Sequence, residues 1–308
     1  MSDLDEGTPL EGGVASDVRV VDTPDGPLVV KKALAKLKVA AEWFSDPSRS
    51  MIEVAAIEAF GSLGGKDTVP EIVWVRPDEN CFAMRLVEPR LRNWKADLLD
   101  GRIDLATAAR VGEILGRFHS RSAGQPDIAR QFDDLRFFRE LRVEPFFGYV
   151  AEAKPEMSVR IHDIAQAMLG RRQALVHGDY SPKNILADGK DVVILDFEVT
   201  HWGDPRFDVG FCLAHLMLKS TLADGNPAQL RGAIGAFLDS YQSHGLPVFD
   251  VGLANITGCL LLARLFGKSP ADYLARLDRE AVEAKAIQLL AIAAAPRISD
   301  FTIPGLQA

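Results

Sequence analysis

Apolar and polar residues follow two different rhythms along this chain. They first alternate over short runs, which is typical of half-buried strands, and later recur with a period of about 3.6, which is typical of helices. The alternation predicts a hairpin at 10–21 and strands at 27–34, 69–75 and 81–87. A helix that begins at Ser45–Pro47 and ends near Gly61 is expected between these strands.

The helical period dominates the remainder of the chain. It predicts helices at 104–120, 132–145 with a break at its end, 158–169, 208–220, 227–244, 248–266 and 270–290. The segment Leu253–Ala263 is apolar nearly all round, so we expect a buried helix there. Two short apolar runs, Ala174–Val176 and Val192–Leu195, predict strands on either side of a polar loop.

The residues with the clearest chemistry lie in and just after this polar loop. Asn184 stands five positions after Asp179 of His177-Gly178-Asp179, which is the spacing of the kinase catalytic loop H-R-D-x-x-x-x-N with glycine in place of arginine. The second strand ends in Asp196-Phe197-Glu198, where kinases carry D-F-G. Phosphoryl transfer needs a carboxylate that accepts the proton of the attacking hydroxyl, and oxygen ligands for Mg²⁺. Asp179 fits the first role, and Asn184 and Asp196 fit the second.

This combined pattern resembles the aminoglycoside phosphotransferase and choline kinase superfamily, whose signature is HGDxxxxN followed by a strand and a D-F/W/P-E/D element. The resemblance implies an α+β, bilobal protein-kinase-like fold. Its small N-lobe has an antiparallel β-sheet and the helix called αC, and its C-lobe is larger and mainly helical. The resemblance also implies ATP and Mg²⁺ as cofactors, and a small-molecule hydroxyl acceptor as the second substrate.

Family members bind adenine at the end of the last N-lobe strand, where the chain crosses to the larger lobe. We therefore place the hinge at Met84–Glu88, with backbone groups of Met84 and Leu86 binding adenine, and the two lobes at 1–87 and 88–308. Gly12, Gly13 and Ser16 lie at the tip of the first hairpin, where backbone N–H groups are expected to approach the phosphates.

The lysine and the glutamate of the nucleotide site each have a competitor. Lys31 shares its strand face with Val29, and Lys32 points the other way. The segment VVKKAL resembles the corresponding segment of methylthioribose kinases, a branch of the same superfamily. This resemblance favours Lys31 as the phosphate-binding lysine. Glu53 at the αC position is expected to pair with that lysine, and Glu58 is the alternative.

Two differences from the known kinase patterns leave open to which branch of the superfamily this sequence is most similar. Glu198 stands where protein kinases have glycine, and it offers an extra Mg²⁺ ligand as in the D-x-E element of methylthioribose kinases. Ser181–Asn184 is instead closer to the aminoglycoside and choline kinase pattern. Asp208 resembles the family's structural aspartate, His119 is expected to be structural, and the pocket candidates are His201, Trp202 and Arg206.

Composition and charge limit the classes of partner that we expect for this 308-residue chain. The net charge is −8 and no basic cluster follows a phosphate backbone, so we expect no nucleic-acid partner. No run approaches the ~18 apolar residues that a membrane span needs, so no membrane partner and a cytoplasmic location are expected. Cys81, Cys212 and Cys259 lack metal-ligand spacing and are expected to be buried thiols. We expect the protein to be a monomer or a homodimer.

These observations predict an ATP-dependent small-molecule kinase whose acceptor is a sugar or an amino alcohol. An aminoglycoside-type antibiotic phosphotransferase and a non-catalytic pseudokinase are the alternatives. Nine residues separate Glu198 from Asp208, which leaves no room for the activation segment of a protein kinase. Residues 221–308 hold eight acidic and seven basic side chains, so a neutral or mildly charged acceptor is favoured over a polycation.

Overall fold

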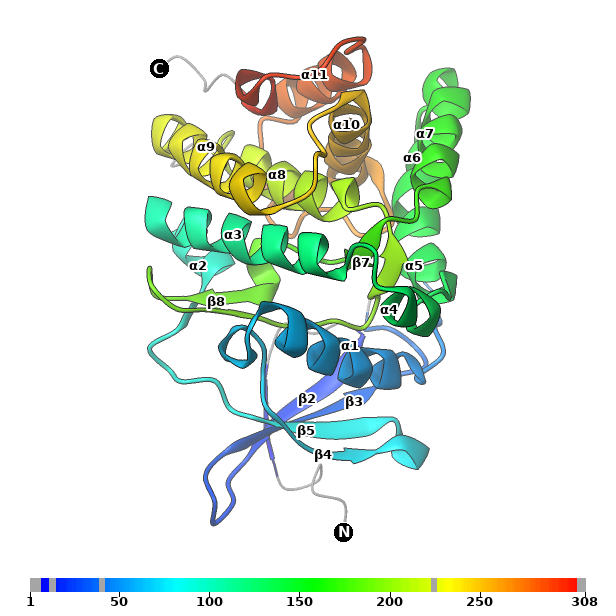
Figure 1. Cartoon of the computed structure of the whole chain (residues 1–308). Coiled ribbons are helices and arrows are strands. Elements are labelled where there is room, and N and C mark those ends of the chain that lie inside the picture. The colour runs from blue at the N-terminus through cyan, green and yellow to red at the C-terminus, as the bar shows by residue number, and fades with distance from the viewer. Residues whose placement is uncertain (1–6, 11–14, 39–41, 223–225, 304–308) are drawn as a thin grey trace.

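The computed structural model describes residues 7–10, 15–38, 42–222 and 226–303. Figure 1 shows a small sheet on one side of a larger helical body. The sheet has five antiparallel strands in the order β1-β2-β3-β5-β4. Their bounds are β1 Thr8–Pro9, β2 Ser16–Val21, β3 Leu28–Ala33, β4 Ile72–Arg76 and β5 Cys81–Arg85. The predicted strands of the N-lobe are therefore confirmed, and Gly12 and Gly13 lie outside the described residues.

Helix α1 (Arg49–Gly64) connects the two parts, because it packs on the sheet on one side and on helix α3 (Leu105–Ser122) on the other (Figure 1). Its predicted end at Gly61 is wrong by one turn. Gly61 is a packing residue, since an added Cβ would lie 3.1 Å from the side chain of Val69. The helix stops at Gly65 instead, whose φ of 115° suits glycine and few other residues.

The larger part is built mainly from helices. Besides α3 they are α2 Trp94–Leu99, α4 Pro126–Gln131, α5 Arg136–Phe138, α6 Tyr149–Ala153, α7 Ser158–Gly170, α8 Arg206–Lys219, α9 Pro227–His244, α10 Val251–Phe266 and α11 Arg279–Leu290. Two small antiparallel sheets join them: β7 (Ala174–Val176) pairs with β10 (His201–Gly203), and β8 (Ile185–Ala187) lies between β6 (Arg92–Asn93) and β9 (Val192–Ile194). The expected bilobal protein-kinase-like arrangement is confirmed.

The core of the large part is formed by α8 and α10, which pack against each other and against α9 and α11. Every residue of α8 is buried, and the predicted burial of Leu253–Ala263 within α10 is confirmed. The side chain of Asp104 accepts backbone hydrogen bonds at the start of α3, and Asp250 does so for α10. The core therefore supports the short strands that flank the polar loop.

Two further predicted helix boundaries are wrong. No break follows 132–145, because the chain continues as a π-helix over Arg139–Gly148 into α6, and its wider turns accommodate Pro145, which has no N–H to donate. No single helix covers 270–290, because the side chain of Asp278 caps a helix that begins only at Arg279.

The described part of the chain contains no helix that is both long and apolar enough to cross a bilayer. Cys81, Cys212 and Cys259 are all buried, as predicted.

Candidate active site

The polar loop after β7 is held in place by Asp208 at the start of α8. The backbone N–H groups of His177 and Gly178 donate to the Asp208 carboxylate at 2.7 and 2.8 Å, and the His119 ring lies 3.2 Å from it. Gly178 has a φ of 78°, and an added Cβ there would lie 2.8 Å from the carbonyl oxygen of Val199. The loop therefore requires glycine next to Asp179, and the predicted structural places of Asp208 and His119 are observed.

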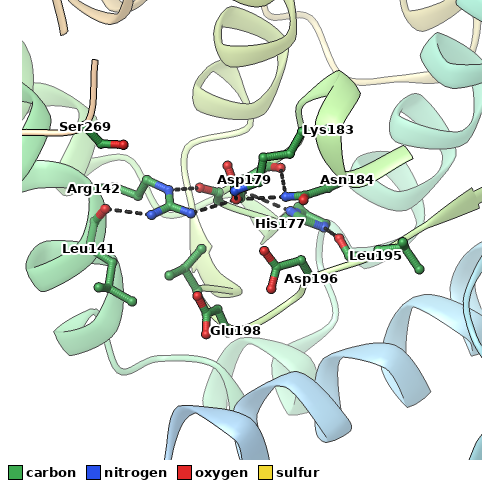
Figure 2. Close-up of polar contacts among 12 residues, drawn as sticks. Leu141, Arg142, His177, Asp179, Lys183, Asn184, Leu195, Asp196, Glu198 and Ser269 are labelled. Atoms are coloured by element: carbon green, nitrogen blue, oxygen red, sulfur yellow. Dashed lines mark hydrogen bonds and ion pairs between the residues drawn. The ribbon is translucent and has the colours of Figure 1, made fainter. Parts of the chain in front are cut away.

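Asp179 is buried and surrounded by donors (Figure 2). Its Oδ2 lies 2.9 Å from Nη2 of Arg142, 2.8 Å from Nδ2 of Asn184 and 3.4 Å from Nζ of Lys183. Arg142 also donates from Nε to the carbonyl oxygen of Gly178 at 2.9 Å. The carboxylate is therefore fixed in position, which a proton acceptor requires.

Lys31 is the lysine that points into the site. Its Nζ lies 2.7 Å from Glu53 and 2.6 Å from Asp196, and its side chain is buried, whereas the neighbouring Lys32 is half-buried. Glu58, the alternative partner, is exposed. The ion pair expected from the sequence is thus present between α1 and β3, and Asp196 joins it from the loop after β9.

The D-F-E segment is held by aromatic packing beneath this ion pair. Phe197 lies 5.0 Å from Phe60 of α1 and 4.6 Å from His177, measured between ring centroids. Asp196 itself has a φ of 69°, a left-handed conformation that residues other than glycine rarely adopt. The packed phenylalanine keeps Asp196 in this strained conformation, with its carboxylate turned toward Lys31.

Three carboxylates crowd this side of the site. One oxygen from each of Glu53, Asp196 and Glu198 lies within 4.8 Å of the others. Burial alone would lower the pKa of Lys31, but these carboxylates raise it above its usual value. Burial raises the pKa of Glu53, and the attraction of Lys31 only partly opposes this. Lys31 and Arg49 form direct ion pairs with these carboxylates, and the positive charges of Lys183 and Arg142 also act on Asp196.

The close spacing of these carboxylate oxygens fits a hard cation such as Mg²⁺. Of the three predicted ligands, Asp196 and Glu198 belong to the cluster, together with Glu53. Asn184 lies instead beside Asp179, to which it donates its amide N–H. Arg49 is fully buried and donates to Glu198 at 2.9 Å, so this carboxylate already has a fixed partner on the α1 side.

The residues predicted to contact adenine lie on the inner strands β3 and β5 or just beyond the end of β5. Val29 is buried and pairs with Met84 across β3 and β5, and Met84 is half-buried. The N–H of Leu86 donates to the carbonyl oxygen of Pro27 at 3.2 Å, so this donor is engaged within the sheet. Among the described residues, the buried Oγ of Ser16 has no hydrogen-bond partner.

The sequence analysis did not identify Arg142, because the helical pattern around a single basic residue does not show which group its side chain contacts.

The three pocket candidates form contacts elsewhere in the structure. His201 stacks on Phe138 with ring centroids 3.9 Å apart, Trp202 is buried in β10, and Arg206 forms ion pairs with Asp204 and Asp250.

The architecture is similar to that of known small-molecule kinases. The amicoumacin kinase hAmiN in complex with AMP-PNP, Ca²⁺ and Ami has a TM-score of 0.57 at 14% identity, over 91% of this chain and 89% of that chain. A choline kinase from Cryptosporidium parvum Iowa II has a TM-score of 0.55 at 13% identity, over 92% of this chain and 88% of that chain. An ADP-bound aminoglycoside phosphotransferase has a TM-score of 0.50 at 14% identity, over 97% of this chain and 95% of that chain. These likenesses define the class, a protein with the fold shared by choline kinases and aminoglycoside phosphotransferases.

A family model described as the phosphotransferase enzyme family (APH) matches residues 6–246, and the chain belongs to that family. A methylthioribose kinase of Bacillus cereus is 26% identical over 65% of this chain. The match covers 57% of the length of that relative. The family resemblance drawn from HGDxxxxN and from VVKKAL is therefore confirmed.

Proposed function

We propose that this protein is an ATP-dependent small-molecule kinase that transfers the γ-phosphoryl group of ATP to a hydroxyl of its acceptor. The observation that carries the proposal is the pairing of two sets of groups. A buried carboxylate, Asp179, is held by three donors, and next to it lies the Lys31–Glu53–Asp196 ion-pair network. The first set suits a hydroxyl that must lose a proton, and the second suits a triphosphate.

In the proposed reaction Asp179 accepts the proton of the acceptor hydroxyl. The hydroxyl oxygen forms a bond to the γ-phosphorus while the bond from this phosphorus to the β–γ bridging oxygen breaks, and ADP leaves with that electron pair. Arg142 and Asn184 orient the Asp179 carboxylate, and Lys31 holds the phosphates in line.

Asp196 and Glu198 would hold Mg²⁺, with Asn184 as the third predicted ligand and Glu53 close enough to assist. When bound, Mg²⁺ supplies positive charge against the phosphate oxygens. The same proposal assigns nucleotide binding to the lobe 1–87, with backbone contacts at Gly12, Gly13, Ser16, Met84 and Leu86, and acceptor binding to the lobe 88–308.

An aminoglycoside-type antibiotic phosphotransferase is the second candidate, because an aminoglycoside phosphotransferase shares this fold over nearly the whole chain. A pseudokinase is disfavoured, because a protein that only binds nucleotide has no need for Lys31, Asp179, Asn184 and Asp196 together.

The test is ATP consumption by the purified protein with Mg²⁺, across sugars, amino alcohols, hydroxy acids, choline and aminoglycosides, with Asp179→Asn as the matched control. Acceptor-dependent ADP formation by the wild type alone supports the proposal. ATP that fails to bind at all overturns it.

A further inference from the structure

Several basic side chains come together on the α8 and α10 side of Asp179. They come from four separate parts of the chain: Lys95 from α2, Lys183 from the polar loop, His215 and Lys219 from the last turns of α8, and Arg264 from the end of α10. We call these five residues the basic cluster. Nothing in the proposed phosphoryl transfer uses His215, Lys219 or Arg264.

Tyr273 and Lys219 form the buried centre of the basic cluster. Lys219 is fully buried, and its Nζ donates to the Tyr273 hydroxyl and to the carbonyl oxygen of His215, each at 3.2 Å. Lys95 pairs with Asp272 at 2.5 Å, and its Nζ lies 6.0 Å from the centroid of the Tyr273 ring. No described carboxylate lies within ion-pair distance of Lys219, so its ammonium group has only neutral partners.

Arg264 links this centre to the catalytic carboxylate. Its Nη1 donates to the carbonyl oxygen of Ser269 at 2.6 Å, and Figure 2 draws Ser269 in the same close-up as Arg142 and Asp179. The charge of Arg264 is attracted by Asp179 and Asp272 and repelled by Arg142. Its Nε is buried and has no hydrogen-bond partner among the described residues. One guanidinium N–H is therefore left unpaired close to the reacting groups.

The members of the basic cluster repel one another. Burial, followed by repulsion from Lys95 and Arg264, lowers the pKa of Lys219 to about 7. Burial lowers the pKa of His215 well below its usual value, and the positive charges of Arg264 and Lys219 lower it further. Gathering like charges in a partly buried place destabilises the free protein, and a bound anion would offset that. The arrangement is the more unusual because the whole chain carries a net charge of −8.

We propose that the basic cluster binds an anionic group of the acceptor, so that the substrates of this kinase are small alcohols bearing a carboxylate or a phosphate. The anionic group lies between Lys219 and Arg264, and the hydroxyl lies at Asp179. This inference rests on the proposed kinase function and narrows its acceptor. It disfavours choline and aminoglycosides, whose positive charge would be repelled here.

The experiment is a binding titration on the full chain saturated with AMP-PNP and Mg²⁺, which keeps anions out of the nucleotide site. Glycerate, glycerol 3-phosphate, glycerol and choline are compared by calorimetry. We expect at least one of the two anions to bind tenfold or more tightly than glycerol, and choline to bind no better than glycerol. The two anionic arms distinguish a carboxylate site from a phosphate site.

The variants Lys219→Met and Arg264→Gln are expected to weaken anion binding tenfold or more and to leave AMP-PNP affinity unchanged. Matched controls are Lys190→Met and Arg231→Gln, which alter exposed residues outside the basic cluster. If either variant fails to fold, Lys95→Met takes its place, because Lys95 is partly exposed at the edge of the cluster.

The possible failures are distinct. Equal affinity for glycerate, glycerol 3-phosphate and glycerol overturns the inference and leaves the kinase proposal standing, as does anion binding that survives in both variants. A parallel loss of AMP-PNP affinity in the variants means that the cluster serves the nucleotide, which also overturns the inference. Absence of AMP-PNP binding to the wild type overturns the kinase proposal and this inference with it.

Discussion

Arg142 holds the carboxylate of Asp179 from the π-helix, with Nη2 2.9 Å from Oδ2, and the same guanidinium binds the carbonyl oxygen of Gly178 through Nε at 2.9 Å. One side chain thus fixes both the carboxylate of Asp179, the proposed proton acceptor, and the backbone that carries it. Asn184 completes this arrangement from the other side with two hydrogen bonds to Asp179. The orientation of Asp179 therefore depends on two partners that can be removed one at a time.

Replacing the proposed proton acceptor tests the reaction directly. Asp179→Asn keeps the shape of the side chain but cannot accept the proton of the hydroxyl. We expect kcat to fall by about 10²–10⁴-fold with ATP affinity retained, as measured by steady-state kinetics and nucleotide titration. Turnover close to that of the wild type with the true acceptor would show that another group accepts the proton.

Arg142 is a positioning residue, and its removal should affect turnover more than nucleotide binding. Arg142→Gln leaves the Asp179 carboxylate with one fewer charged partner, so we expect a drop of at least about tenfold in kcat. Arg142→Lys restores the charge without the two-pronged contact and should recover activity only in part. If Gln and Lys at this position behave alike, and both melt at a lower temperature, the role of Arg142 is structural.

The two adjacent lysines of β3 provide a matched pair. Lys31→Ala removes the buried ammonium that contacts Glu53 and Asp196, and kcat/KM should fall by about 10²–10³-fold. Lys32→Ala changes a half-buried residue, for which we expect a change in stability below about 0.5 kcal/mol and little loss of activity. Activity retained by both variants would contradict the kinase proposal itself.

The carboxylate cluster predicts that nucleotide binding depends on a divalent cation. Adding EDTA, or replacing Asp196 by alanine, should weaken ATP binding in calorimetry. Glu198→Gly is the finer probe, because Glu198 also pairs with Arg49. It should shift the Mg²⁺ concentration that supports half-maximal activity if Glu198 is a ligand. A change in thermal stability alone would assign Glu198 to the ion pair with Arg49.

The lowered pKa of Lys219 predicts that the free energy of unfolding of this protein depends on pH. This pKa is about 7 in the folded protein against the ordinary value of 10.5, so between these values the unfolded chain binds more protons. Stability therefore rises with pH across this window, by at most about 1.4 kcal/mol per pH unit from this group. The destabilisation caused by burying the charged Lys219 ammonium group is fully present below pH 7. The groups that face Lys219 are Lys95, Arg264, His215, Asp272, Tyr273 and Cys212.

In Lys219→Met this contribution is absent. We expect the variant to be more stable than the wild type, with the largest difference below pH 7 and a smaller one toward pH 10, in urea unfolding at a series of pH values. A difference that does not change with pH would mean that Lys219 titrates normally.

The polar loop of the candidate site could be predicted from the sequence because its residues are close in the chain. Asp179, Asn184 and Asp196 lie within eighteen positions, and short strands on both sides fix their relative places. Lys31 and Glu53 needed the additional rule that neighbouring strand residues face opposite ways. The family resemblance then placed these two segments in one site.

The basic cluster could not be predicted in this way. Its residues come from segments as much as a hundred or more positions apart, and each of them alone resembles an ordinary surface lysine or arginine. The count of eight acidic and seven basic residues in 221–308 did not reveal the cluster, because only Arg264 of its five members lies in that segment. A sum over a segment does not reveal where its charges meet.

Helix α8 connects the loop that carries Asp179 with the basic cluster. Asp208 near its first turn ties down the loop that carries Asp179, and Lys219 at its last turn belongs to the basic cluster, about 16 Å farther along the axis at 1.5 Å per residue. Because every residue of this helix is buried, the two ends cannot shift independently. In the proposed acceptor site this one helix therefore acts as a rigid spacer, which keeps the end that would hold the hydroxyl and the end that would hold the anionic group at a constant separation.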